Sequence, residues 1–180
     1  EVLTDAGCRP GDLKLVVVTH GDTDHTGNCV FLRKEYGARI AIHREEAKTA
    51  ETGDMLVNRK TKRGWSLRLG FALSKTIIKG KFKADILLAD GDDLSAHGLE
   101  ARVIHTPGHS LGSVSILTAE GDLFCGDFLV GGKSPRVNSL VDDAAAMAAS
   151  VAKIRGFNIN QIYPGHGPAF TMQEFLKNCL

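Results

Sequence analysis

The 180-residue sequence has few cysteines, no long apolar run and almost no net charge. Its cysteines, Cys8, Cys29, Cys125 and Cys179, are too scattered for a zinc ribbon or a redox dithiol. A reducing compartment fits this usage, so we expect a cytoplasmic protein. The formal charge of +1 gives no reason to expect nucleic acid or a membrane as the principal partner.

No stretch approaches the roughly 20 apolar residues that cross a bilayer, and the first residues lack the basic head and apolar run of a secretory leader. The chain starts with Glu1 rather than Met, so a preceding leader stays open. With 43% hydrophobic and 24% charged residues, the composition fits one globular domain over residues 1–180 with a sizeable core.

Apolar periodicity and turn residues predict short strands that alternate with helices. A buried strand is predicted at residues 13–19, followed by a polar loop at 20–26. Further strands are predicted at 39–43, 101–105, 113–118, 122–125 and 161–163, and helices at 28–36, at 144–154 and after the capping box of Thr171 and Glu174.

Residues 55–83 are the least regular part and form a basic apolar insertion. From Arg59 to Lys83 the sequence has cations and no acid, and apolar residues are interleaved with the charges at 65–73. We expect segment 65–73 to lie over or beside the functional site and to set substrate preference; a solvated surface element is the alternative. The charge also leaves nucleic-acid processing open, although no recognition module supports it.

Four residues of metal-ligand type occur within six positions directly after the first predicted strand: His20, Asp22, Asp24 and His25. Loops at strand ends commonly present functional groups. Residues two apart in an extended loop point the same way. His20 and Asp22 therefore suit one metal ion, and Asp24 and His25 suit a second.

Three later residues each follow a short strand beside glycine: His109 in Thr-Pro-Gly-His-Ser, Asp127 in Cys-Gly-Asp and His166 in Pro-Gly-His-Gly. Glycine permits tight turns and close approach to a ligand, so these side chains can reach a common cleft. Each signal is weak alone. Together with the first motif they predict a two-metal site.

In this order the motifs resemble those of the metallo-β-lactamase superfamily, and the resemblance spans nearly the whole chain. It implies a mixed α/β (α+β) fold, an αββα sandwich with a two-metal site where the two sheets meet. Members usually place several strands before the first histidine motif. We therefore expect this chain to lack part of the N-terminal sheet and to expose apolar surface there, which more chain or a partner would cover.

The resemblance also implies roles for individual residues. Two metals are implied, the first held by His20, Asp22 and His109, the second by Asp24, His25 and His166, with Asp127 between them. The implied activity is that of a metal-dependent hydrolase of the glyoxalase II or lactonase-like kind, in which a hydroxide bridging two metals attacks an ester, thioester, lactone or related bond. Asp24 and Asp127 are then the catalytic candidates, and the substrate is a small molecule.

Asp22 departs from the usual His-x-His-x-Asp-His pattern of the family, because a second histidine normally stands there. A carboxylate is a harder, anionic ligand, so iron and manganese become alternatives to the expected zinc. Flavodiiron reductases similarly carry a carboxylate at this position. A non-haem iron oxidoreductase of the flavodiiron or sulfur dioxygenase type is therefore the alternative function, and a non-catalytic metal-binding domain is a third. A homodimer also stays open.

Other polar residues are assigned supporting roles. A Pro-Gly pair separates His105 from His109, so we expect His105 to make a structural hydrogen bond rather than to bind metal. His43 and His97 are predicted to be surface histidines. Cys125 is predicted to be a core thiol, and Asn138 and Ser139 either line the cleft or cap the next helix.

Overall fold

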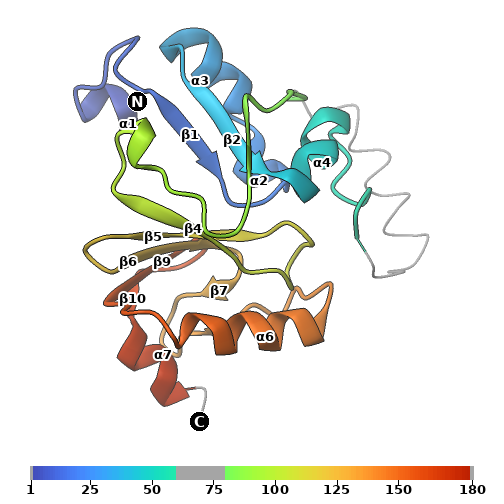
Figure 1. Ribbon diagram of the computed structural model, residues 1–180, viewed down its shortest axis with the longest axis vertical. Helices are drawn as coiled ribbons and strands as arrows, with labels where there is room; N and C mark the ends of the chain where they lie inside the picture. Colours follow the sequence, from blue (N-terminus) through green and yellow to red (C-terminus); the bar gives the residue numbers. More distant parts are fainter. Residues whose placement is uncertain (1, 60–79, 179–180) are drawn as a thin grey trace.

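The computed structural model describes residues 2–59 and 80–178. Two β-sheets lie face to face, and helices cover both outer sides (Figure 1). The predicted αββα sandwich is thereby confirmed. Over the described ranges, every helix is too short or too polar to cross a membrane.

The smaller sheet is parallel and has the order β1-β2-β3, with β1 at Leu15–Val18, β2 at Arg39–His43 and β3 at Ile86–Leu88. In the central strand β2, Ile40 and Ile42 pack against α3 (Cys29–Tyr36) and α4 (Ala47–Thr52). Ala41 faces the second sheet. Because β2 is covered on both faces, its sequence is almost continuously apolar.

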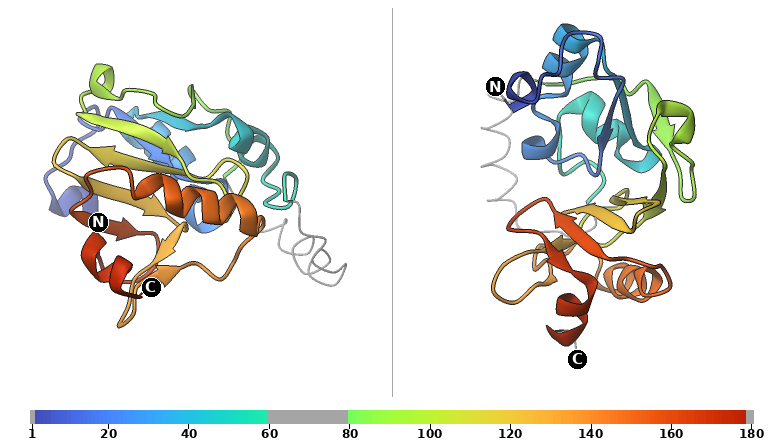
Figure 2. Two further views of the ribbon diagram at one scale, coloured as in Figure 1. Left: turned by 60° about the horizontal axis from the view of Figure 1, so that its bottom comes forward. Right: turned by 90° about the vertical axis from the view of Figure 1, so that its left-hand side faces the viewer.

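The larger sheet has the order β10-β9-β6-β5-β4. Its strands are β4 (Ala101–His105), β5 (Val114–Thr118), β6 (Asp122–Gly126), β9 (Gln161–Pro164) and β10 (Phe170–Thr171). The helices α6 (Ala144–Ile154) and α7 (Met172–Asn178) cover its outer face, as both views in Figure 2 show. Neighbouring strands are antiparallel except β6 and β9, which run parallel.

The remaining described elements are short: α1 (Val2–Asp5), α2 (Thr23–Thr26), the 3-10 helices η1 (Arg44–Glu46) and η2 (Ser95–His97), and the hairpin of β7 (Leu129–Val130) with β8 (Arg136–Val137). The prediction of a loop at residues 20–26 was partly wrong. The backbone N–H of Thr26 donates to Asp22 O at 3.0 Å, which closes the single helical turn α2. Asp22 is its N-cap.

The smaller sheet leaves part of the inner face of the larger sheet uncovered. Phe124 pairs with Ile116 across β5 and β6, and Ile116 belongs to the core between the sheets. Phe124 therefore also points to this side. It stacks on Tyr163 of β9 at a ring distance of 4.8 Å, and the two side chains are 43% and 37% exposed. Two stacked aromatic rings are thus exposed beside the intersheet core.

The prediction of a surface His43 was wrong. It ends β2 inside the sandwich and is only 5% exposed. Its ring stacks on His105 at 4.3 Å, and its Nδ1 accepts a hydrogen bond from Glu45 N, which caps η1. His97 lies in η2 and is half-buried. Cys125 is 1% exposed, as predicted for a core thiol.

Burial lowers the pKa of His43 from 6.5 to about 4. Between these values the unfolded chain binds the proton that the folded chain excludes. The free energy of unfolding should therefore fall as the pH is lowered from 6.5 towards 4. In His43→Asn, which keeps an acceptor for Glu45 N but cannot titrate, this fall should be smaller. Urea unfolding of both proteins at equal metal content measures the difference, and identical pH profiles would contradict the prediction.

Candidate metal centre

The seven predicted ligand residues come from loops that meet at one edge of the sandwich. The first four follow β1, Asp127 follows β6, His166 follows β9, and His109 lies in the connection from β4 to β5. Val114 N donates to Thr19 O at 2.9 Å, which ties the start of β5 to the end of β1. Parallel pairing of β6 with β9 delivers Asp127 and His166 to the same edge.

The side chains of all seven residues converge. Within the described part of the chain, three groups have ligand atoms within 4.8 Å of one another: His20, Asp22 and His109; His20, His25 and Asp127; and Asp24, His25 and His166. The first group is mostly buried, whereas Asp24 and His166 of the third are 58% and 55% exposed. One side of the centre is therefore open to solvent.

The first group brings hydrogen-bond acceptors together. His109 Nδ1 donates to Leu140 O at 2.7 Å, so a neutral His109 ring presents a bare Nε2 to Asp22 Oδ2, 3.1 Å away. His20 Nε2 is 3.7 Å from the same oxygen. Burial lowers the pKa of His20 to about 3, so this ring is neutral near pH 7. Facing acceptors are unfavourable unless a cation lies between them.

The second set of contacts surrounds Asp127. Its Oδ1 is 3.1 Å from His25 Nε2 and 3.5 Å from His166 Nε2, while its Oδ2 is 3.9 Å from His109 Nε2. Asp127 Oδ1, His25 Nε2 and His20 Nε2 are buried and have no hydrogen-bond partner among the described residues. These atoms are suited to coordinate cations. The Asp127 carboxylate lies between His25 and His166 on one side and His109 on the other, which we call the two halves of the centre.

In the half of the centre that contains His25 and His166, opposite charges stabilise one another. The adjacent Asp127 carboxylate raises the pKa of His25 although burial opposes it. Burial opposes ionisation of Asp127, but its contact with His25 and the nearby histidines hold the pKa of Asp127 below its usual range. His166 Nε2 also lies 3.3 Å from Asp24 Oδ2. Imidazole and carboxylate are ligand types that zinc, iron and manganese accept.

Arg59 was counted among the basic residues, but its role was not predicted. Its Nη2 lies 2.6 and 2.8 Å from the two carboxylate oxygens of Asp22, and its Nη1 donates to His109 O. Although burial opposes it, the contact with His109 and the charge of Arg59 hold the pKa of Asp22 well below its usual range. Basic composition alone gave no signal for this specific pairing.

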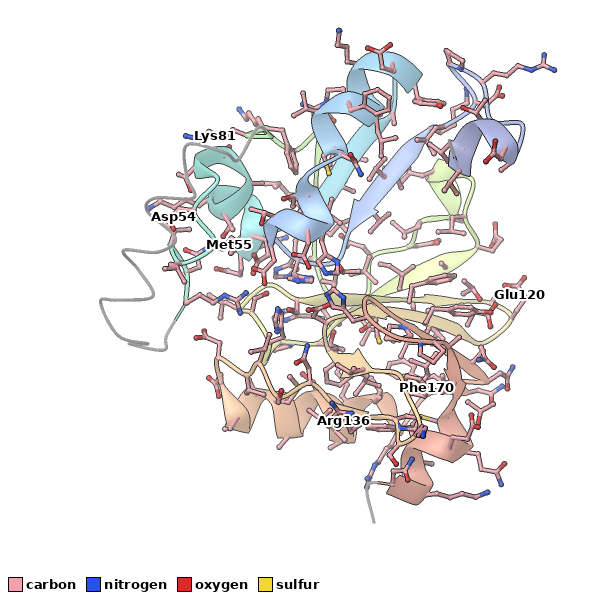
Figure 3. The ribbon with its side chains drawn as sticks, turned by 180° about the vertical axis from the view of Figure 1, so that it is seen from behind. Asp54, Met55, Lys81, Glu120, Arg136 and Phe170 are labelled. Atoms are coloured by element: carbon pink, nitrogen blue, oxygen red, sulfur yellow. The ribbon has the colours of Figure 1, made fainter. Side chains whose placement is uncertain are left out.

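The segment before Arg59 also contacts the first motif. Met55, labelled in Figure 3, lies where the two halves of the sandwich meet. Its sulfur accepts from the backbone N–H of Thr23 at 3.3 Å and from the Thr23 hydroxyl at 3.4 Å. The start of the predicted insertion at 55–83 thus packs on the motif. Segment 65–73, expected over the site, lies outside the described residues.

Asn138 supports the centre through hydrogen bonds to the backbone. Its Nδ2 donates to Asp127 O at 2.9 Å, and its Oδ1 accepts from Leu140 N at 2.9 Å. Leu140 O in turn accepts from His109, so Asn138 joins the backbone of one ligand residue to the orienting partner of another. It does not cap the following helix; that role belongs to Asp143.

His105 lies outside the three groups found among residues 2–59 and 80–178. Its ring Nε2 is 2.9 Å from Leu111 O, in the turn that contains His109. The predicted structural hydrogen bond of His105 is therefore confirmed. Glu46, which sequence reasoning missed, is a buried carboxylate that binds the backbone of two ligand loops.

Comparison with known proteins places these features in a family. A family model described as the Metallo-beta-lactamase superfamily matches residues 1–166. Acyl-coenzyme A thioesterase MBLAC2 of Bos taurus is 26% identical over 190 residues, covering 96% of this chain and 62% of the relative. Hydroxyacylglutathione hydrolase of Shewanella pealeana is 30% identical over 131 residues, covering 72% of this chain and 38% of the relative. The chain thus spans less than two thirds of the length of these relatives.

The fold is also found in solved structures. TTHA1623, whose crystal structure was determined in a di-iron-bound form, superposes with a TM-score of 0.71 at 22% identity. The similarity covers 98% of this chain and 80% of TTHA1623. At this identity the similarity supports the fold alone.

The geometry predicts a contrast between Asp127→Ala and His105→Ala. Asp127→Ala removes the carboxylate that lies between both halves, so bound metal per chain should fall by at least one equivalent. His105→Ala removes a supporting hydrogen bond, and its metal content should stay near that of the unmodified protein. Metal analysis of both variants after identical purification makes the comparison. Equal, mild losses would show that the two residues have been assigned the wrong roles.

Proposed function

This chain belongs to the metallo-beta-lactamase superfamily, and we propose that it is a metal-dependent hydrolase with two cations in its centre. The observation that carries the proposal is the convergence of seven imidazole and carboxylate side chains, several of them buried without a hydrogen-bond partner among the described residues. Such atoms are costly to bury unless a cation binds them. An ester, thioester, lactone or related bond is the proposed target.

We assign the residues to the cations as follows: His20, Asp22 and His109 hold the first, Asp24, His25 and His166 hold the second, and Asp127 is shared. The distances from Asp127 to His25 and His166 on one side, and to His109 on the other, support the shared role. Zinc is the expected metal, with iron or manganese as alternatives because Asp22 contributes an oxygen.

Bound divalent cations would supply the nucleophile by lowering the pKa of water from about 16 to about 7, and would polarise the bond under attack. The protein's own residues then position the substrate and limit the access of water. His20 and His109 are almost fully buried on the inner side. Asp24 and His166 are more than half exposed, so substrate reaches the centre from their side. We assign Asp24 the task of holding the water and accepting its proton.

Asp22 has two functions in this scheme. Its Oδ2 lies 3.7 Å from His20 Nε2 and 3.1 Å from His109 Nε2, and Arg59 Nη2 donates to both carboxylate oxygens. Oδ2 can therefore contribute to the first cation while Oδ1 stays paired with the guanidinium. Arg59 offsets the negative charge that Asp22 adds in place of the usual histidine.

Acyl thioesters are the first substrates to test, because the names of both curated relatives describe hydrolases of acyl compounds. We expect purified protein to hydrolyse such thioesters, to lose activity when a chelator removes its metal, and to regain it when zinc, iron or manganese is restored. Asp24→Asn should lower kcat by a larger factor than it changes KM. Oxygen consumption without hydrolysis would instead favour the iron oxidoreductase, and metal binding without turnover on any ester, thioester or lactone would contradict an enzymatic role.

A separate prediction concerns Asp22 and Arg59. Asp22→His should shift metal preference towards zinc, because imidazole replaces a hard oxygen ligand. It also leaves the guanidinium of Arg59 beside the cation without its carboxylate, so total metal content should fall. The double variant Asp22→His with Arg59→Gln should restore the content and keep the zinc preference. Metal analysis after growth with competing metals reads out both effects; unchanged preference in the double variant would show that Asp22 does not coordinate.

A further inference from the structure

Glu46 is a buried carboxylate that links two loops of the metal centre. It ends η1 and is only 2% exposed. Its Oε2 accepts a hydrogen bond from Gly21 N at 3.0 Å, and its Oε1 accepts one from Gly112 N at 2.9 Å. Gly21 stands between the first two ligand residues of the motif after β1. Gly112 lies three residues after His109.

Each oxygen of the Glu46 carboxylate thus binds the backbone of a different loop. Hydrogen bonds from N–H groups to an ionised carboxylate are short and roughly twice as strong as neutral ones. Removing the carboxylate would leave two buried N–H groups without an acceptor, which destabilises both loops. Glu46 therefore fixes the distance between the loop of His20 and Asp22 and the loop of His109.

The shape of the two loops depends on the same side chain. A Cβ atom placed on Gly21 would lie 2.7 Å from Glu46 Oε2, and one placed on Gly112 would lie 2.7 Å from Glu46 Cγ. Both distances are shorter than side-chain carbons tolerate. The two glycines allow the backbone to approach Glu46 closely enough for its hydrogen bonds.

Glu46 is itself attached to the buried central strand of the smaller sheet. It follows the central strand β2, and the buried His43 at the end of β2 caps η1 by accepting from Glu45 N. The side chain is therefore held by the core on one side and holds two ligand loops on the other.

We propose that Glu46 is a positioning residue that selectively maintains the first cation site. The inference rests on the two-cation centre proposed above. Glu46 binds both loops that supply the first group, His20, Asp22 and His109. The second group takes Asp24 and His25 from α2, which has its own helical hydrogen bonds, and His166 from the loop after β9. Loss of the Glu46 carboxylate weakens the first site and spares the second.

The test is Glu46→Gln. Glutamine keeps one acceptor oxygen, but its amide nitrogen faces a backbone N–H, so one of the two links is lost. Calorimetric titration of metal-free protein with Zn²⁺ should show two equivalents for the unmodified chain. In the variant the affinity of one equivalent should fall about 10- to 100-fold, as for other groups that orient metal ligands. The affinity of the other equivalent should be unchanged.

Nuclear magnetic resonance of the histidine rings identifies the affected site. With one equivalent of Zn²⁺ on the variant, the ring signals of His25 and His166 should shift, and that of His109 should not. Asp85→Asn is the matched control, because Asp85 also accepts a backbone N–H, from Ile40 at 2.7 Å, and pairs with Arg33 away from the centre. It should lower the unfolding temperature without changing either Zn²⁺ affinity.

Gly112→Ala provides an independent route to the same result, because its methyl group would displace Glu46 without removing the carboxylate. Gly112→Ala should show the same loss of Zn²⁺ affinity at the first site alone. It tests the inference if Glu46→Gln does not fold. Two unchanged affinities, or equal losses at both sites, in a folded variant would overturn the inference while leaving the two-cation centre intact. Failure of the unmodified chain to bind Zn²⁺, Fe²⁺ or Mn²⁺ would instead count against the proposed function and, with it, this inference.

Discussion

Hydrogen-bond acceptors that face one another inside the protein are the constraint on which the rest of the centre depends. His109 uses its Nδ1 proton on Leu140 O, so its Nε2 meets Asp22 Oδ2 without a proton between them when the ring is neutral. Asp127 Oδ1 and His25 Nε2 are likewise buried without hydrogen-bond partners in the described part of the chain. A positive ion removes this cost at each point, which is why we assign the centre to cations.

The fold brings these atoms together because of how the strands end. The parallel strands β6 and β9 of the larger sheet end side by side. At the same edge, a hydrogen bond from Val114 N joins the start of β5 to the end of β1 in the smaller sheet. Backbone anchors then refine the positions. Asn138 joins the Asp127 backbone to the partner of His109, and Glu46 joins two ligand loops. The core therefore fixes the positions of the candidate ligands, while Asp24 and His166 remain exposed to solvent.

Much of this arrangement could be predicted from local sequence. The centre of the buried strand β2 is an apolar run, as such a strand requires. The predicted capping box is formed by hydrogen bonds from Thr171 N to Glu174 and from Glu174 N to Thr171. His109, Asp127 and His166 were found because each follows a strand beside glycine. Together with the first motif they predicted a common site, and the resemblance then implied which residues share a metal, since strand order itself is not encoded in any single segment.

The parts that could not be predicted are long-range pairings. Burial of His43 depends on stacking with His105 from another sheet, and nothing in the residues around His43 signals that partner. The pairing of Arg59 with Asp22 and the links from Glu46 to Gly21 and Gly112 likewise join distant positions. Local pattern identifies candidate ligands, whereas the residues that orient them emerge only when the chain is folded.

Anomalous diffraction from crystals of the protein purified with its own metal tests the central claim most directly. The account predicts two anomalous peaks per chain, one among His20, Asp22 and His109 and one among Asp24, His25 and His166, with Asp127 contacting both. Diffraction on either side of the zinc, iron and manganese absorption edges would identify each metal. A metal-replete crystal with no peak between these side chains, or with His109 and His166 directed into different clefts, would contradict the account.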